Sequence, residues 1–161
     1  MSFDTAPKYR VLGNTETSKM RDLLRVFSEA FEDPQNYTSR QPSDTYLRQL
    51  LHRDTFFVVV AEKAGKIIGG LAAYELIKFE QERSEIYIYD LAVLDEHRRQ
   101  GVATKLIETR KHVAANCGAH VVFVKADNYD PPAIALYSKL GTREDVLHFD
   151  IEVPTDTAKL G

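Results

Sequence analysis

Long apolar runs are missing from this chain of 161 residues. No stretch is long enough to span a bilayer, and Met1–Pro7 has no apolar core, so we expect neither a membrane protein nor a secretory signal peptide. The single cysteine, Cys117, cannot form an intrachain disulfide, which fits a reducing compartment. The protein is therefore expected to be cytoplasmic.

An excess of basic residues is missing as well. The formal net charge is -3, whereas proteins that bind nucleic acid usually carry a basic surface. The five histidines and Cys117 lack the spacing of a structural zinc site or of a catalytic HExxH helix. We therefore expect no nucleic acid partner, no membrane partner and no metal.

Length and composition indicate one globular domain. Hydrophobic residues make up 43% of the chain and charged residues 28%, which is typical of a protein that folds around its own core. We expect a single domain over residues 1–161, with its core at about 8–153 and a tail at 154–161.

Hydrophobic periodicity predicts two helices ahead of the main sheet. The first carries apolar residues from Met20 to Phe31 and ends at Pro34, and the second, with Ser43 or Asp44 as its N-cap, carries apolar residues up to Leu51. Strand composition is found at residues 8–12, 56–61, 66–76, 84–93, 119–125 and 146–153. The strands 56–61 and 66–76 are expected to form an antiparallel hairpin, with its turn at Ala64-Gly65.

The segment Ser84–Val93 predicts a central strand, because it is apolar or aromatic on both faces for most of its length. After a polar turn, a helix over 101–117 has an apolar stripe that includes Cys117, which we place in the core, and Gly118 is its expected C-cap. The order strand, helix, strand predicts parallel strands at 84–93 and 119–125. A helix over 131–140 and a final strand, Val146–Val153, complete the pattern.

The turn between the central strand and its helix, residues 95–104, has the features of a phosphate-binding site. A helix start leaves backbone N–H groups unpaired, and Gly101 lets a ligand come close to them. Arg98 and Arg99 can add contacts to phosphate oxygens, and Ala103 is small. A solvated loop is the alternative. Because the Walker A and GxGxxG patterns are absent, CoA is the expected ligand.

Two motifs resemble the acetyl-CoA-binding segments of the GNAT superfamily of acetyltransferases. The first is Leu91-Ala92-Val93 followed by Arg98-Arg99-Gln100-Gly101-Val102-Ala103, which is similar to Q/R-x-x-G-x-G/A after a central strand. The second is Asp127-Asn128 followed by Ala133 to Gly141, which is similar to the last helix of that superfamily. The resemblance implies an α/β (α+β) GNAT fold, with a mixed central β-sheet of six to seven strands flanked by about four helices.

The resemblance also implies which residues hold acetyl-CoA, the acetyl donor. The expected set is Leu91, Ala92, Val93, Arg98, Arg99, Gln100, Gly101, Val102, Ala103, Thr104, Asn128, Ala133 and Tyr137. In GNAT enzymes the strand segment that corresponds to Leu91–Val93 is splayed open toward pantetheine and the thioester carbonyl. A β-bulge near Asp90 is expected to open the strand in this way.

Asp90 and Tyr137 are the candidate catalytic residues. Asp90 ends an apolar strand, where an unpaired carboxylate is costly, so we expect a general base, acting directly or through water, or a group that orients the ammonium. A carboxylate satisfied by backbone N–H groups is the alternative. Burial, or a neighbour such as Glu85 or Asp150, must raise the pKa of Asp90. Tyr137 resembles the residue that protonates the CoA thiolate; core packing is its alternative.

The acceptor follows from a narrower resemblance. Lys78–Val93 and Leu147–Ile151 are similar to the GNAT-type aminoglycoside 3-N-acetyltransferases, over about Tyr9–Val153. This implies direct acetyl transfer to the 3-amino group of an aminoglycoside such as gentamicin, antibiotic resistance, and a homodimer. The residues expected to bind the polycationic substrate are Glu85, Asp90, Asp127 and Asp150. The chain departs from these enzymes at Asp130-Pro131-Pro132, where they carry an acidic pair before the proline.

Two other functions stay open. A polyamine acceptor fits an acidic cleft equally well, with the same fold and mechanism. A CoA-binding sensor module without turnover is the alternative from a different class.

Overall fold

A computed structural model describes residues 6–155 of the chain, except for the side chains of His112 and Val113. The described residues fall into two compact units, Met1–Ala126 and Asp127–Gly161, of which residues 1–5 and 156–161 lie outside the description. The first unit contains the sheet and the second contains one helix. Each is described by itself, and the single domain expected over the whole chain stays a prediction.

The first unit is built on a sheet of five strands in the order β1-β2-β3-β4-β5. They are β1 Lys8–Val11, β2 Phe56–Lys63, β3 Lys66–Ile77, β4 Ser84–Val93 and β5 Ala119–Val124. The first four pair antiparallel, and β4 pairs parallel with β5. The hairpin of β2 and β3 and the parallel pairing of β4 with β5 are confirmed.

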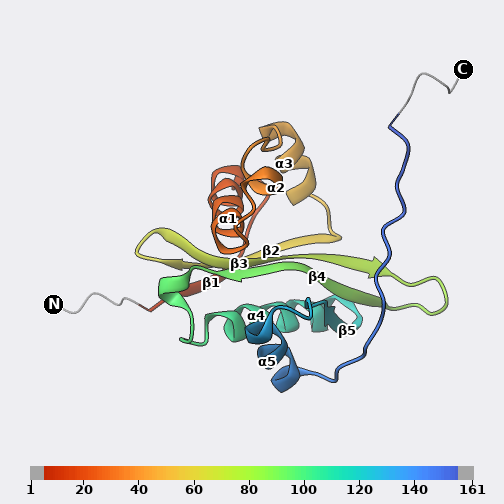
Figure 1. Cartoon of the computed structure of the whole chain (residues 1–161). Coiled ribbons are helices and arrows are strands. Elements are labelled where there is room, and N and C mark those ends of the chain that lie inside the picture. Colours follow the sequence, from red (N-terminus) through yellow and green to blue (C-terminus); the bar gives the residue numbers. More distant parts are fainter. Residues whose placement is uncertain (1–5, 156–161) are drawn as a thin grey trace, which may run out of the picture. The chain divides into compact units, whose positions relative to one another are not determined.

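Helices cover both faces of the sheet in this unit (Figure 1). One face is covered by α1 Thr17–Ala30, the four-residue α2 Pro34–Tyr37 and α3 Asp44–Leu51, and the other by α4 Val102–Cys117. Ser43 caps α3 as expected, because its side chain accepts a hydrogen bond from the backbone N–H of Tyr46. The short helix α2, by contrast, is not among the elements predicted from the sequence.

The core of the first unit has a separate layer on each face of β2 to β4. On the face toward α1, the buried cluster joins helix residues such as Leu23 and Phe27 to Val58 and Val60 of β2. On the opposite face, Ile86 and Ile88 of β4 and Leu106 of α4 are fully buried. The central position of β4 is confirmed, since it has a strand neighbour on either side.

Two expectations about α4 and the chain end are corrected by the structure. Cys117, expected in the core, is exposed, because it is the last residue of α4, next to the left-handed C-cap Gly118. The strand expected at Val146–Val153 is not formed, since residues 142–155 contain no strand. Its side chains alternate, but alternation needs a partner strand to become a ladder, and the described sheet gives it none. The predicted tail, 154–161, lies mostly outside the described residues.

The second unit contains α5, Pro131–Leu140. Asp130 caps this helix by accepting a hydrogen bond from the backbone N–H of Ala133 at 3.1 Å, and Pro131 occupies its first turn. The predicted helix and its end at Gly141 are confirmed. The sheet of the described residues has five strands, not six or seven, mainly because the final predicted strand is not formed.

Candidate active site

The strand β4 changes its structure at Tyr89. Its partners on β3 are Ala73 for Ile88 and Ala72 for Asp90, so that Tyr89 is an extra residue without an opposite partner. This is a β-bulge, and it re-aims the side chains that follow it. The bulge expected near Asp90 is therefore confirmed.

Pairing with β5 stops at the same point. The parallel ladder runs from Ser84 with Ala119 to Ile88 with Val124, whereas β4 continues to Val93. From Asp90 to Val93 the main chain of β4 thus has a described strand partner on the β3 side only. On its other side, N–H groups within Leu91–Val93 lie outside the described ladder, so that a ligand can pair with them.

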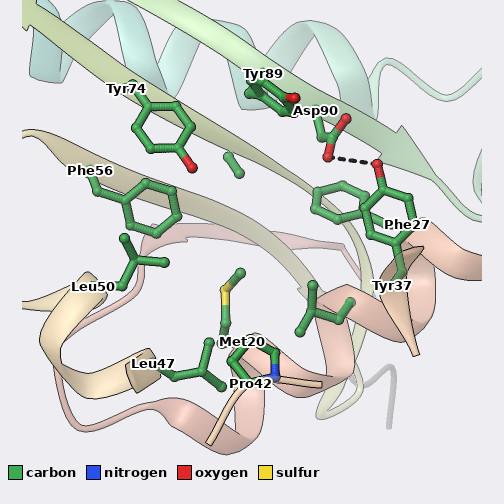
Figure 2. Close-up of a pocket in the computed structure, with 12 residues that line it drawn as sticks. Met20, Phe27, Tyr37, Pro42, Leu47, Leu50, Phe56, Tyr74, Tyr89 and Asp90 are labelled. Atoms are coloured by element: carbon green, nitrogen blue, oxygen red, sulfur yellow. Dashed lines mark hydrogen bonds between the residues drawn. The ribbon is translucent and has the colours of Figure 1, made fainter. Parts of the chain in front are cut away.

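A pocket of about 180 Å³ lies beside the bulge, on the sheet face that α1 to α3 cover. Figure 2 shows its helix side formed by apolar residues such as Met20 and Leu47, and its sheet side formed by aromatic rings from β2, β3 and β4. The carboxylate of Asp90 points into the pocket (Figure 2). The pocket therefore combines apolar walls with one carboxylate, which suits a ligand that carries an amine.

Asp90 has one described hydrogen bond in this pocket. The hydroxyl of Tyr37 donates to Oδ2 of Asp90 at 2.8 Å (Figure 2). Burial raises the pKa of the Asp90 carboxyl, and the hydrogen bond from Tyr37 opposes this by favouring the carboxylate. The pKa is therefore raised, as a general base requires, and burial rather than a neighbouring carboxylate is the cause.

Tyr37 is a site residue that the sequence did not reveal. It ends α2, which begins at Pro34 and is capped by Asp33, whose side chain accepts from the backbone N–H of Asn36. The rings of Phe27 and Phe31 lie 5.8 and 5.6 Å from the Tyr37 ring, between centroids, and hold it in place. An Asp-Pro pair is a helix-start signal, so the helix could have been found, although its contact with Asp90 could not.

The helix α4 starts without a side-chain cap. Its N-cap is Gly101, which has a left-handed backbone with φ of 78°, and a Cβ built there would meet no atom within 4 Å. The first N–H groups of the helix thus have no side-chain cap, and they lie at the positive end of its dipole. This arrangement fits a diphosphate, so the residues present fit the CoA expected from the sequence.

The residues of the turn before α4 have different tasks. The Nε of Arg98 donates to the carbonyl of Val93 at 3.1 Å, and its Nη1 lies 2.8 Å from Oδ1 of Asp95. Arg98 thus ties the turn to the end of β4. Arg99 has a positive φ of 62° and is exposed, so its charge is presented to solvent beside the helix start. Gln100 is exposed too, as is expected of a residue that meets a ligand.

The four residues expected to bind the substrate are divided between the two units. Asp90 lines the pocket, and Glu85 lies on the same strand, 3.7 Å from Lys78 and 3.7 Å from His120. Asp127 and Asp150 belong to the second unit, where both are exposed and Asp150 lies 2.9 Å from Nε2 of His148.

The second unit contains the remaining predicted cofactor residues, Asn128, Ala133 and Tyr137. Burial, reinforced by the charge of Asp130, raises the pKa of Tyr137 to about 12. The phenol therefore stays protonated at neutral pH and is a hydrogen-bond donor.

Two further findings concern the described residues only. No His, Cys, Asp and Glu side chains among them form a group that could hold a metal ion. No helix in residues 6–155 is long and apolar enough to cross a membrane.

The bulged central strand, the pocket carboxylate and the uncapped helix start define a transferase that takes an acyl group from a CoA thioester. The chain belongs to the Acetyltransferase (GNAT) family, whose model matches residues 20–142. Members of this family use acetyl-CoA, and the mixed α/β fold expected for them is the one observed.

Three proteins illustrate the relationship. An aminoglycoside acetyltransferase of known structure, from an uncultured soil metagenomic sample, is 55% identical, with 96% of this chain and 100% of that chain covered and a TM-score of 0.91. A second soil aminoglycoside acetyltransferase, in complex with sisomicin, is 33% identical, with coverages of 95% and 100% and a TM-score of 0.87. An uncharacterized N-acetyltransferase of Bacillus subtilis (strain 168), YhfO, is 23% identical, with coverages of 86% and 95%.

Proposed function

We propose that the protein transfers acetyl from acetyl-CoA to an amino group of an aminoglycoside, with the 3-amino group of a gentamicin-type drug as the specific acceptor. The observation that carries the proposal is the half-buried carboxylate of Asp90, which lies in an aromatic pocket where β4 separates from β5. The relative that is 55% identical supports the acceptor class, because it is an aminoglycoside acetyltransferase. The 3-amino position rests on the resemblance of Lys78–Val93.

Asp90 prepares the acceptor. An amine attacks a thioester only when its nitrogen is neutral, and an aminoglycoside brings ammonium groups. The carboxylate first attracts the ammonium and then takes its proton, directly or through water, for which the raised pKa suits it. Tyr37 keeps the carboxylate oriented during this transfer.

The main chain of β4 prepares the donor. As the amine nitrogen bonds to the thioester carbonyl carbon, negative charge grows on the carbonyl oxygen, and those N–H groups of Leu91–Val93 that face away from β3 are suited to stabilise it. The C–S bond then breaks, sulfur leaves with the electron pair, and the nitrogen gives up one further proton to solvent to form the neutral amide. Tyr137 is proposed to donate a hydrogen bond to this sulfur; its raised pKa favours such a bond over complete loss of its proton.

The helix start is proposed to bind the diphosphate of CoA. The contact residues are those from Arg98 to Thr104, with the amide groups after Gly101 as donors and Arg99 as the exposed charge. Glu85, Asp127 and Asp150 are proposed to attract the remaining ammonium groups of the acceptor. Because Glu85 already lies near Lys78 and His120, its contribution is expected to be smaller than that of Asp90.

The proposal is tested by the release of CoA thiol from purified protein with gentamicin, sisomicin and spermidine as acceptors. The exposed Cys117 reacts with thiol reagents, so the assay uses a Cys117→Ser variant. Rapid release with the drugs and NMR evidence for acetyl on the 3-amino nitrogen are expected. Release with spermidine alone would assign the enzyme to polyamines, and binding of acetyl-CoA without release by any amine would favour the sensor module. The homodimer and the role in resistance stay predictions.

A further inference from the structure

Aromatic side chains continue across the sheet beyond the pocket. The ring centroids of Phe56 and Tyr74 are 5.1 Å apart, and those of Tyr74 and Tyr89 are 5.9 Å apart. Tyr87 follows Tyr89 at 5.6 Å, and Phe123 stacks on Tyr87 at 4.8 Å with an angle of 3° between the rings. These five residues, which we name the aromatic row, join four strands from β2 to β5.

Only one end of the aromatic row, at Phe56, is buried in the core. Phe56 is buried, whereas Tyr74 is 39% and Tyr89 is 61% exposed, and Tyr87 and Phe123 are partly exposed. Folding normally hides adjacent aromatic rings, because their burial is strongly favourable. A run of accessible rings that begins inside the candidate active site is therefore a surface prepared for a ligand.

The aromatic row already accommodates a cation. The ammonium of Lys125 lies over the ring of Tyr87, 5.4 Å from its centroid. A ring face attracts an ammonium through its quadrupole and also packs against the C–H faces of a sugar. Both properties are combined in an aminosugar, while a linear polyamine offers the charge without the ring.

We propose that the aromatic row binds the rings of the acceptor that do not react, while the pocket at Asp90 holds the reacting amine. The inference rests on the proposed function and deepens it, because it gives the non-reacting rings of the acceptor a binding surface on the protein. Phe56, Tyr74 and Tyr89 line the pocket, so that an acceptor can extend from Asp90 along the row toward β5. Tyr87 and Phe123 then contact rings that a single-ring acceptor does not possess.

The test measures the dissociation constant of sisomicin by calorimetry and the acetyl-transfer rate for wild type and three variants. Tyr87→Leu removes a ring from the row, Tyr87→Phe keeps the ring, and Tyr9→Leu is the matched control. Tyr9 is also a partly exposed strand tyrosine with a lysine over its ring, Lys105 at 5.8 Å, but it lies on β1, outside the row. Acetyl-CoA affinity and the melting temperature show whether each variant folds.

Tyr87→Leu should weaken sisomicin binding about tenfold, the size of one good ring contact, whereas Tyr87→Phe and Tyr9→Leu stay within about twofold of wild type. With 2-deoxystreptamine, a single ring, kcat/KM should change less than about twofold in every variant. If Tyr87→Leu does not fold, Phe123→Leu on the edge strand β5 replaces it. If Tyr87→Leu leaves the sisomicin affinity unchanged, or weakens the one-ring acceptor equally, the aromatic row does not bind the non-reacting rings.

Failure of the proposed function gives a different pattern. If no amine is acetylated but Tyr87→Leu still weakens sisomicin binding about tenfold, the row stands and the acceptor chemistry is wrong. If wild type and Tyr87→Leu acetylate and bind sisomicin equally well, the proposed function is supported and the binding role of the aromatic row is refuted. Absence of any sisomicin binding overturns both.

Discussion

Each face of the central sheet holds an ionisable side chain that is at least half-buried, and the two side chains have opposite surroundings. On the face toward α1, Asp90 accepts a hydrogen bond from Tyr37 and lines a pocket. On the face toward α4, Arg110 is fully buried, and its guanidinium lies 3.6 Å from the ring centroid of Phe57. Within the described residues its three nitrogens have no hydrogen-bond partner.

The comparison of Asp90 with Arg110 distinguishes a side chain that can meet a ligand from one that only packs inside the fold. Burial favours the neutral form of both groups, so it raises the pKa of Asp90 and lowers the pKa of Arg110. Only Asp90 lines a pocket that a second molecule can enter, and its Tyr37 contact favours the charged form. A shifted pKa is thus a sign of function where it coincides with access.

The largest expected effect is that of Asp90→Asn. The amide cannot take a proton, so kcat should fall at least about 100-fold, while Tyr37 can still donate to its oxygen. The folded-state pKa of Asp90 is raised, so ionised Asp90 disfavours folding and stability falls as pH rises through that pKa. The variant should therefore keep or raise the melting temperature at pH 7. Thiol-release kinetics and calorimetry check this, with exposed Asp54→Asn as control; an active variant would remove the base from the mechanism.

The next effect concerns the start of α4, and the fold offers a control at the other end of the same helix. Gly101 and Gly118 have φ values of 78° and 79°, and neither has an atom within 4 Å of a built Cβ. Alanine should cost about 1 kcal/mol of folding free energy at either position. Only Gly101→Ala should raise the KM for acetyl-CoA, about tenfold, since its methyl fills the space before the free amides. Equal KM values in the two variants would place the diphosphate elsewhere.

Tyr37→Phe tests whether the hydrogen bond from Tyr37 sets the pKa of Asp90 in the pocket. Loss of the hydrogen bond that lowers the pKa of Asp90 should raise that pKa further, so the acid limb of kcat/KM moves to higher pH. The rate loss should reach about tenfold on the acid side and shrink above the limb, where Asp90 is ionised in both proteins. Tyr46→Phe, an exposed tyrosine of α3, is the control. A uniform loss at every pH would indicate a structural role alone.

The smallest effect on activity is expected for Arg110→Met. Methionine keeps much of the volume and removes a buried charge without hydrogen bonds in the described structure, so stability should rise by about 1 kcal/mol. Both kinetic constants should stay within about twofold. Lys111→Met removes the same charge from the next, exposed position, and should leave the melting temperature unchanged. A lower melting temperature for Arg110→Met would show that the guanidinium stabilises the fold, for which its contact with the Phe57 ring is the available cause.

Local patterns predicted most of the fold. The hairpin of β2 and β3, the central strand β4 and the helices α4 and α5 all depend on neighbouring residues, and the structure contains each of them. Alternation failed at Val146–Val153, because a strand also needs a partner that no local pattern supplies. Helical periodicity also placed Cys117 in the core wrongly, because this residue continues the apolar stripe of α4 but lies at the exposed end of the helix.

The site was predicted in part. Asp90 and the bulge could be anticipated, because a carboxylate in an apolar strand is unusual and the motif after it is specific. Tyr37 could not be assigned, since it is 53 positions away from Asp90 in the chain. The aromatic row escaped for the same reason: its rings come from four strands, and only the register of the sheet brings Tyr74 opposite Tyr87.

The helix that carries Tyr37 has only four residues, between two polar stretches of the chain. Most positions from 32 to 42 are exposed or half-exposed, and changes there disturb little of the core. Substitutions in this segment can therefore reshape one wall of the pocket at a small cost in stability. This short stretch is where we expect inherited variation in acceptor preference to accumulate first.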